Sequence, residues 1–320
     1  MKILANDGIS QSGIKKLEEA GFEVTITKVA QEQLINYINK EKIQVLLVRS
    51  GTEVRKDLID SCPSLKIIGR GGVGMDNIDV AYARKKGIHV INTPEASSSS
   101  VAELVFAHLF GGVRYLYDSN RNMPLSGDTQ FKNLKKNYSG GTELRGKTLG
   151  IIGLGRIGKA VARIALGVGM KVIASDDHVG ETNITLHFYN DQVVKVPIKT
   201  EPVQDLIQHS DFITVHVPDQ NKPVLGKKEF EKMKNGVGII NTSRGGIVDE
   251  VALIEALENG KVAFAGLDVF ENEPSPAITV LMDHRISLSP HIGAATIEAQ
   301  DRIGRELAEQ IIEILKKEKV

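Results

Sequence analysis

The sequence has one cysteine, no tryptophan and no excess of charge of either sign. The single cysteine, Cys62, excludes an internal disulfide and a cysteine-based metal cluster, and we expect a buried thiol there rather than a nucleophile. Basic and acidic residues number 40 each, so composition gives no reason to expect nucleic acid or an anionic membrane as a partner. No apolar run approaches the roughly 20 residues of a membrane span, and the amino terminus is too polar for a secretory signal. We therefore expect a cytoplasmic protein.

Short β-branched runs alternate with longer amphipathic segments along most of the chain, a pattern typical of parallel sheets of the α/β class. The expected strands are 2–4, 43–49, 66–69, 88–92, 148–153, 171–175, 212–217, 237–241, 263–268 and 286–288. The expected helices are 10–20, 31–40, 79–86, 97–115, 156–169, 227–234, 249–259 and 296–317.

This alternation forms two series, and the long carboxy-terminal helix is expected to pack back on the first. We therefore expect two Rossmann-like or flavodoxin-like domains with parallel sheets, linked by two interdomain crossings. Residues 1–96 and 290–320 would form a flavodoxin-like, substrate-binding domain, and residues 97–289 a Rossmann domain that binds the cofactor. The segment 184–198 interrupts the second series and alternates like two strands around Asn190-Asp191, so we expect an inserted β-hairpin.

The motif Gly153-Leu154-Gly155-Arg156-Ile157-Gly158 follows a strand pattern and opens an amphipathic helix. A GxGxxG motif alone is weak evidence, but this context is that of a dinucleotide-binding turn. Gly153 permits the tight turn, Gly155 lets the backbone approach a pyrophosphate, and Gly158 lets the helix pack on the strand. The amides of Arg156 and Ile157, at the start of the helix, would face the phosphates.

An acidic residue, Asp176, follows the next expected strand. A carboxylate at that place can accept the ribose hydroxyls of the cofactor, and it would repel a 2′-phosphate. The next residues, Asp177 and His178, supply no arginine that would hold such a phosphate. The sequence therefore predicts NAD rather than NADP.

Three polar side chains follow later strands. Arg244 comes just after 237–241, Glu273 follows 263–268, and His291 follows 286–288. Because ligands of open α/β sheets bind outside the carboxyl ends of the strands, we expect all three at one edge. No pair of the eight histidines has zinc-like spacing, so we expect no metal.

Oxidation of a 2-hydroxy acid needs this set of side chains. A histidine can take the hydroxyl proton near neutral pH, and a carboxylate on its other nitrogen fixes the tautomer. An arginine can hold the substrate carboxylate and polarise the developing keto group. Taken singly, Arg244 can also be a loop arginine, Glu273 a solvated acid and His291 a turn residue, but the three loops together favour catalysis.

At this point the residues resemble the D-isomer-specific 2-hydroxyacid dehydrogenases over nearly the whole chain. The resemblance rests on GRGGVGMDNID (69–79), NTPEASSSSVAEL (92–104), TELRGKTLGIIGLGRIG (142–158), HVP (216–218), NTSRGGIVDE (241–250), GLDVFENEP (266–274) and SPHIGAAT (289–296). It implies that Arg244, Glu273 and His291 are the catalytic set. It also implies that NAD contacts, besides the glycine turn and Asp176, are Val217, Pro218, Thr242, Ser243, Asp268, Gly293 and Ala294.

Within that family, VRSGTEV (48–54) and GTELRGKTLG (141–150) are most similar to the phosphoglycerate dehydrogenase subgroup. This similarity implies a phosphorylated 2-hydroxy acid as substrate, D-3-phosphoglycerate, at the entry to serine synthesis. The residues that would face the substrate are Arg49, Ser50, Gly72, Val73 and Gly74. Arg49 is one candidate for the 3-phosphate, and Lys135 or Lys136 of a neighbouring subunit is another.

Two other functions stay open on the same residues. One is hydroxypyruvate or glyoxylate reduction, or D-lactate oxidation, on the same frame. The other is an NAD-sensing binding protein of the corepressor kind, which would keep the same arginine, glutamate and histidine.

Departures from the family pattern bear on regulation and assembly. The sequence ends at Val320, so we expect no serine feedback through a carboxy-terminal regulatory domain. The stretch before GTEL reads KNLKKNYSG and has none of the usual tryptophan. The resemblance implies a homodimer or homotetramer, formed chiefly through the helix 97–115 and the stretch after it.

Overall fold

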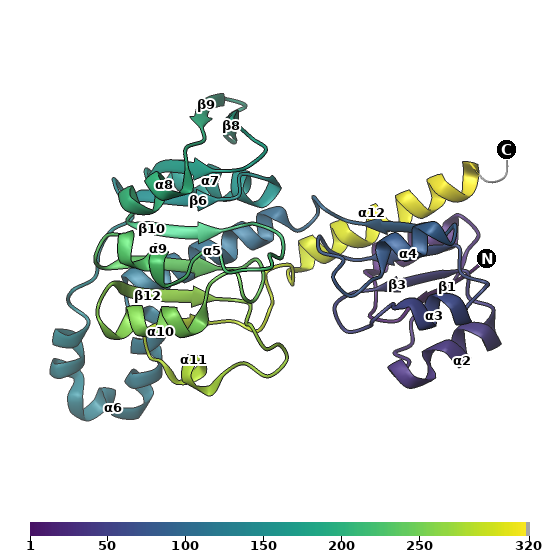
Figure 1. Cartoon of the computed structure of the whole chain (residues 1–320), viewed down its shortest axis with the longest axis horizontal. Coiled ribbons are helices and arrows are strands. Elements are labelled where there is room, and N and C mark those ends of the chain that lie inside the picture. Colours follow the sequence, from purple (N-terminus) through teal and green to yellow (C-terminus); the bar gives the residue numbers. More distant parts are fainter. Residues whose placement is uncertain (318–320) are drawn as a thin grey trace. The chain divides into compact units, whose positions relative to one another are not determined.

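The computed structural model describes residues 1–317 and divides the chain into two compact units (Figure 1). Unit 1 comprises Met1–Ser98 and the segment from Ala294 onward, and unit 2 comprises Ser99–Gly293. The expected crossings, after residues 96 and 289, lie a few residues before these boundaries. Residues 318–320 of the expected first domain lie outside the described residues.

Unit 1 is a parallel sheet of five strands in the order β2-β1-β3-β4-β5, the order of flavodoxin-like folds. Its strands are β1 (Lys2–Ala5), β2 (Glu23–Thr25), β3 (Val45–Val48), β4 (Ile67–Arg70) and β5 (His89–Asn92). Its helices are α1 (Gln11–Glu19), α2 (Gln31–Glu41), α3 (Lys56–Ser61), α4 (Val80–Lys85) and α12 (Ile297–Lys317).

Both faces of this sheet are covered by helices. Successive residues of a strand point to opposite sides, so each strand contributes apolar side chains to both faces. On one face Leu4, Leu46 and Ile68 pack with side chains of α2, α3 and α4, and Cys62 is buried with them. Burial raises the pKa of the Cys62 thiol to about 11, so it stays protonated and unreactive. On the other face Ile3, Val45 and Ile67 pack with side chains of α1 and α12.

Helices α1 and α12 approach closely through two glycines. A Cβ on Gly13 would lie 2.7 Å from the carbonyl oxygen of Gly304, and a Cβ on Gly304 would overlap the Ser10 hydroxyl. Ser10 caps α1, since its side chain accepts a hydrogen bond from the Gly13 amide. This contact fixes the carboxy-terminal helix on the amino-terminal strands, as its amphipathic pattern predicts.

Unit 2 is a parallel sheet of six strands in the order β13-β12-β11-β10-β6-β7. Its strands are β6 (Thr148–Ile152), β7 (Lys171–Ser175), β10 (Phe212–Val215), β11 (Val237–Asn241), β12 (Val262–Leu267) and β13 (Ile286–Leu288). The helices are α5 (Ser98–Val113), α6 (Leu116–Asn137), α7 (Arg156–Val168), α8 (Val203–His209), α9 (Lys227–Lys232), α10 (Glu250–Glu258) and α11 (Ile278–Met282). The expectation of two α/β parts with parallel sheets is confirmed.

The inserted hairpin is also present. Strands β8 (Glu181–His187) and β9 (Val193–Lys199) pair antiparallel and extend beyond the expected limits of the insert. Ile184 and Ile198 are buried against the core of unit 2, whereas Tyr189 at the tip is fully exposed. After β9 the chain reaches Thr200, which bridges to Ala174 of β7 in parallel.

Helix α6 has no counterpart among the expected elements. Its segment contains Pro124, and residue Gln130 has non-helical dihedrals where the helix kinks. The proline and the kink interrupt the helical period, and Leu134 is its one buried residue within the described chain, so the segment does not show the pattern of a helix that packs on a sheet. The short elements β2, α3, α8 and α11 were also missed, because runs this brief show too few periods to recognise. Of the helices within residues 1–317, none is long and apolar enough to cross a membrane.

Substitution of Gly13 by alanine tests the contact between α1 and α12. The neighbouring atom is backbone and cannot rotate away, so we expect a loss of about 1–3 kcal/mol in unfolding free energy, despite the higher helix propensity of alanine. Urea unfolding measures this loss. The control is Lys15→Ala on the exposed side of α1, which should change stability by about 0.5 kcal/mol at most. Equal midpoints for Gly13→Ala and wild type would contradict the close contact.

Candidate active site

The glycine turn joins β6 to α7. Gly153 has φ 94°, a left-handed conformation that favours glycine, and Gly155 is the N-cap of α7. A Cβ on Gly158 would overlap the carbonyl oxygen of Gly153, so the close approach of helix and strand requires a glycine there. A Cβ on Gly155 would meet nothing within 4 Å, which leaves room beside the backbone at the start of the helix. Because the N-cap is a glycine, it has no side chain to cap the first amides of α7.

Asp176 directly follows β7 and is bound to this turn. One carboxylate oxygen accepts a hydrogen bond from the Leu154 amide at 2.7 Å, and the other accepts from the amides of His178 and Val179. Burial alone would raise the pKa of Asp176, but these amides hold it below its usual value. A negative charge is therefore fixed next to the glycine turn, as the preference for NAD over NADP requires.

The ends of β10 and β11 carry two buried polar atoms without a hydrogen-bond partner among the described residues, His216 Nδ1 and Thr242 Oγ1. Burial lowers the pKa of His216 to about 3, so its ring is neutral, and its Nε2 lies 2.9 Å from the Thr214 hydroxyl. Unpaired buried groups of this kind fit a ligand that supplies the missing bonds. Val217 and Pro218, the other expected NAD contacts after β10, directly follow His216. After β11, the Ser243 hydroxyl donates a hydrogen bond to the side-chain oxygen of Asn241.

The strand order brings the loops of Arg244, Glu273 and His291 together. They follow β11, β12 and β13, which are neighbours in the sheet. A Cβ on Gly245 would overlap the carbonyl oxygen of Phe270, so the arginine loop packs directly on the glutamate loop. The Arg244 guanidinium donates to the carbonyl oxygen of Ser243 at 2.7 Å.

The glutamate loop is also fixed to the start of α10. The Glu250 amide donates to the Glu271 carboxylate, and the Glu271 amide donates to the Glu250 carboxylate. Burial, together with the charge of Glu271, raises the pKa of Glu250. These reciprocal bonds hold the backbone that leads to Glu273.

His291 and Glu273 form a hydrogen-bonded pair. The distance from His291 Nδ1 to Glu273 Oε2 is 2.8 Å, and Glu273 Oε1 accepts a hydrogen bond from the Phe270 amide. No hydrogen bond to His291 Nε2 comes from any residue the structure describes, and the side chain is 45% exposed. A histidine held in this way keeps one ring nitrogen available to a substrate.

Asp268 holds the turn that carries His291. Its buried carboxylate accepts hydrogen bonds from the Ile292 and Gly293 amides, each at 2.8 Å, and from the Ser289 hydroxyl at 2.6 Å. Its backbone carbonyl accepts from the His291 amide. His291 has φ 53°, an uncommon conformation for a residue with a side chain, and these bonds maintain it.

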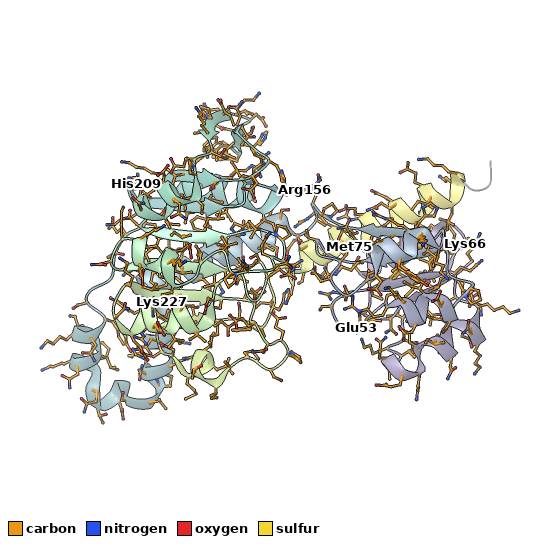
Figure 2. The ribbon with its side chains drawn as sticks, viewed as in Figure 1. Glu53, Lys66, Met75, Arg156, His209 and Lys227 are labelled. Carbon is orange, nitrogen blue, oxygen red and sulfur yellow. The ribbon has the colours of Figure 1, made fainter. Side chains whose placement is uncertain are left out.

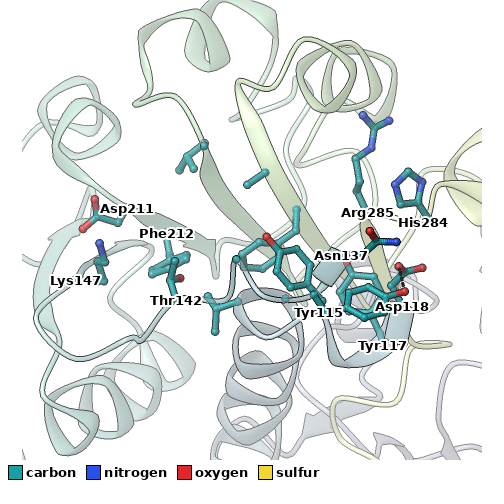
Figure 3. A pocket seen from close by; sticks show the side chains of 18 of the residues that line it. Tyr115, Tyr117, Asp118, Asn137, Thr142, Lys147, Asp211, Phe212, His284 and Arg285 are labelled. Atoms are coloured by element: carbon teal, nitrogen blue, oxygen red, sulfur yellow. Dashed lines mark hydrogen bonds between the residues drawn. The ribbon is translucent and has the colours of Figure 1, made fainter. Parts of the chain in front are cut away.

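All of these groups lie at the carboxyl edge of the unit 2 sheet. Arg156 marks this edge in Figure 2, and His209, which precedes β10, lies at the opposite one. A cavity of about 810 Å³ also lies at that opposite edge (Figure 3), between Asp118 and Asn137 of α6 and the residues that begin strands, such as Phe212. That cavity is therefore separate from the candidate active site at the carboxyl edge.

The residues expected to face the substrate lie in unit 1. Arg49 and Ser50 follow β3 and line a cavity of about 520 Å³, and the side chain of Arg49 passes beside Gly71. Gly72 has φ 153°, and a Cβ there would overlap the guanidinium of Arg70. The backbone of this loop is anchored by Asn92 and Thr93, which donate to the carbonyl oxygens of Val73 and Gly72. Gly74 completes the loop, and Ala294 begins the second segment of the unit.

Sequence reasoning missed two charged residues of this cavity, Asp7 and Lys28. Lys28 forms an ion pair with Asp7, which also accepts hydrogen bonds from the Arg49 amide and the Thr52 hydroxyl. Burial works to raise the pKa of Asp7, but these donors lower it below its usual value. Asp7 follows β1, so its place after a strand could have signalled it, whereas Lys28 lies in an irregular segment without such a signal.

The arrangement fits a dinucleotide. Room at Gly155, the charge of Asp176 and the unpaired Thr242 hydroxyl suit the phosphates, ribose and polar groups of NAD. In the part of the chain that the structure describes, no group of three histidine, cysteine or carboxylate side chains is arranged to hold a metal ion.

Comparisons with known proteins agree with this geometry. Residues 106–293 match the D-isomer specific 2-hydroxyacid dehydrogenase, NAD binding domain. The chain is 40% identical to a D-3-phosphoglycerate dehydrogenase of Methanocaldococcus jannaschii, with 99% of this chain and 58% of that protein aligned. It is also 40% identical to a hydroxypyruvate reductase of Thermotoga maritima, with 98% of each chain aligned. The chain thus spans little more than half of the first relative and almost all of the second.

A solved structure is similar over the same extent. The NAD⁺-bound 3-phosphoglycerate dehydrogenase of Entamoeba histolytica superimposes with a TM-score of 0.76 at 28% identity, covering 99% of this chain and 95% of that one. With the family match over more than half of the chain, these findings identify the fold and the cofactor together. The chain belongs to the D-isomer-specific 2-hydroxyacid dehydrogenases, a family of NAD-dependent oxidoreductases.

Proposed function

We propose that this protein oxidises D-3-phosphoglycerate to 3-phosphohydroxypyruvate, with NAD as the hydride acceptor. The observation that carries the proposal is the hydrogen-bonded pair of His291 and Glu273 beside the Arg244 loop. A reaction of this class would supply the carbon skeleton for serine synthesis. The relatives named phosphoglycerate dehydrogenase support this choice of substrate.

In this proposal His291 is the base. Because Glu273 accepts the hydrogen bond from Nδ1, the ring is held as the Nδ1–H tautomer, and Nε2 can take the proton of the substrate hydroxyl. NAD, when bound, accepts the hydride from carbon 2. Glu273 then stabilises the imidazolium, and the Phe270 amide keeps the Glu273 carboxylate in place.

Arg244 binds the substrate carboxylate in this proposal. A guanidinium can hold both carboxylate oxygens at once, which fixes the orientation of carbon 2. The same positive charge stabilises the oxygen of the developing keto group. Thr242, Asp268 and Asp176 are assigned to NAD.

The substrate phosphate is assigned to Lys28 and Arg49, with the neighbouring Ser50. Two cations line the cavity of unit 1 and one carboxylate, Asp7, opposes them, which leaves an excess of positive charge for a phosphate. An unphosphorylated hydroxy acid has no need of the second cation. Lys28 is therefore an addition to the residues expected from sequence.

Reduction of hydroxypyruvate is the second candidate. The observation that favours it is the Thermotoga relative, which is as similar as the phosphoglycerate dehydrogenases and has nearly the length of this chain. The same base, arginine and cofactor would serve, with only the group on carbon 3 changed.

Turnover with NAD and each of 3-phosphoglycerate, D-glycerate and D-lactate separates these functions. We expect the phosphorylated acid to have the highest kcat/KM, because its phosphate gains charged contacts. NADH formation at 340 nm is the measurement. Turnover of the unphosphorylated acids alone would refute the proposed substrate.

Three variants extend this experiment. Lys28→Ala should raise KM for 3-phosphoglycerate about tenfold and leave D-glycerate unaffected, since one charged hydrogen bond is lost. The substitution of the exposed Lys40 by alanine should change neither KM.

The third variant, His291→Gln, should abolish turnover while calorimetry still detects NAD binding. Equal losses of turnover and of NAD binding would indicate a structural role for His291.

Substitution of Asp176 by alanine tests the choice of cofactor. Loss of the charge should weaken the binding of NAD roughly tenfold and reduce the preference for NAD over NADP. Dissociation constants of both dinucleotides, measured by calorimetry, report the ratio. Asp177→Ala, at the exposed neighbour, is the matched control. An unchanged ratio in Asp176→Ala would assign discrimination to another residue.

We also propose that the protein is a homodimer formed through α6 and the end of α5. Large apolar side chains are exposed there on unit 2: Phe110, Leu116, Met123, Leu125 and Phe131. A patch of this kind on a soluble chain is typical of a subunit interface.

Leu125→Lys tests this assembly, since Leu125 is 80% exposed and a charge there would be buried between subunits. We expect sedimentation velocity to show a shift toward monomer. Ile26→Lys, at an exposed apolar residue of unit 1, should leave the oligomer intact. A wild-type protein that sediments as a monomer would contradict the proposal.

A further inference from the structure

A buried histidine, His108, lies on the face of α5 that packs on the sheet of unit 2. It is 4% exposed, and both ring nitrogens have hydroxyl partners: Ser287 Oγ lies 2.8 Å from Nδ1 and Ser289 Oγ lies 3.0 Å from Nε2. A Cβ on Gly266 of β12 would lie 2.6 Å from the Cβ of His108, so the absent side chain makes room for the imidazole. Ser287 and Ser289 are two residues apart and present their hydroxyls to the same ring.

The positions of the protons in this group follow from the partners. Asp268 is a carboxylate that accepts hydrogen bonds, so the Ser289 hydroxyl must donate its one proton to it. The Ser289 oxygen can then only accept from His108, which places a proton on Nε2. Nδ1 keeps its lone pair and accepts from the Ser287 hydroxyl. The result is a directed chain from Ser287 through His108 and Ser289 to Asp268.

This series of hydrogen bonds ends at Asp268, which holds the turn that carries His291. Asp268 binds the amides of Ile292 and Gly293 with its carboxylate and the amide of His291 with its carbonyl oxygen. A carboxylate with a fixed donor on Oδ1 cannot rotate without breaking the bonds to this turn. The series of hydrogen bonds therefore links α5, on the face of the sheet, to the position of His291.

The ring is neutral in this environment. Burial lowers the pKa of His108, and the charge of Asp268 offsets this only in part. A neutral ring can donate on one nitrogen and accept on the other, as the directed chain requires. A leucine at this position would fill the space but leave both serines without their partner.

We propose that His108 is a positioning residue, which orients Asp268 through Ser289 and thereby fixes both the proposed NAD contact of Asp268 and the turn of His291. The consequence for NAD binding rests on the proposed assignment of Asp268 to NAD, and the consequence for turnover rests on the proposed reaction as well.

The first test uses the wild-type protein without cofactor. Nitrogen-15 NMR of the histidine side chains, with His108 assigned by its absence from His108→Gln, reports its tautomer. We expect an Nε2–H ring that is neutral at pH 7, since burial lowers the pKa of His108. A charged ring or an Nδ1–H tautomer would overturn the directed chain.

The second test compares His108→Leu with His108→Gln. Leucine should raise the dissociation constant of NAD and lower kcat, each about tenfold, and glutamine, which can still donate to Ser289, should restore most of both. Ser289→Ala should have the effect of leucine, and the double variant should be no worse than either single one, because they break the same chain.

The matched control is Phe106→Leu, a buried neighbour on α5 that makes no hydrogen bond to the site. It should lower the melting temperature and leave NAD affinity and kcat unchanged. If His108→Leu behaves in the same way, the histidine has only a packing role and the proposal fails. Failure of the substrate assignment would instead leave the change in NAD affinity intact.

Discussion

The functional groups of unit 2 depend on one constraint, the parallel pairing of its six strands. Because all strands run in the same direction, the residues that follow them meet at one edge. The glycine turn follows β6 and Asp176 follows β7, while Arg244, Glu273 and His291 follow three strands that are neighbours in the sheet. The strand order therefore places the glycine turn and Asp176 in one half of the edge and the candidate catalytic side chains in the other. Reversal of one strand would move its loop to the other end of the sheet.

Within that edge, backbone contacts fix the loops to one another. Gly245 packs on Phe270, the amides and carboxylates of Glu250 and Glu271 bond reciprocally, and Asp268 binds the turn of His291. A long side chain can sample many rotamers, but its starting point is set by the backbone. The loops thus hold the arginine, the glutamate and the histidine within a narrow range of positions, which is how a folded chain lowers the entropic cost of a reaction.

Much of this was predictable from the sequence, for reasons that also explain the failures. Parallel strands carry buried β-branched runs, so the two sheets, the glycine turn and the loops of Arg244, Glu273 and His291 have strong local signals. Helix α6 lacks such a signal, because Pro124 and the kink at Gln130 interrupt its helical period. The partnership of His108 with Ser287 and Ser289 joins residues about 180 positions apart, and the ion pair of Lys28 with Asp7 crosses between two loops. Contacts of this kind arise only from the tertiary fold, and a single sequence does not encode them as a local pattern.

The single buried cysteine has a practical consequence. Since the thiol of Cys62 is protonated and enclosed, a maleimide dye added to the wild-type protein should find almost no target. A cysteine introduced at Tyr189, at the fully exposed tip of the hairpin, would then be labelled alone. A second one at the exposed Ile26 would place a dye on each unit without removing a native residue from the core. The chain is in this sense ready for single-molecule fluorescence with one dye on each unit.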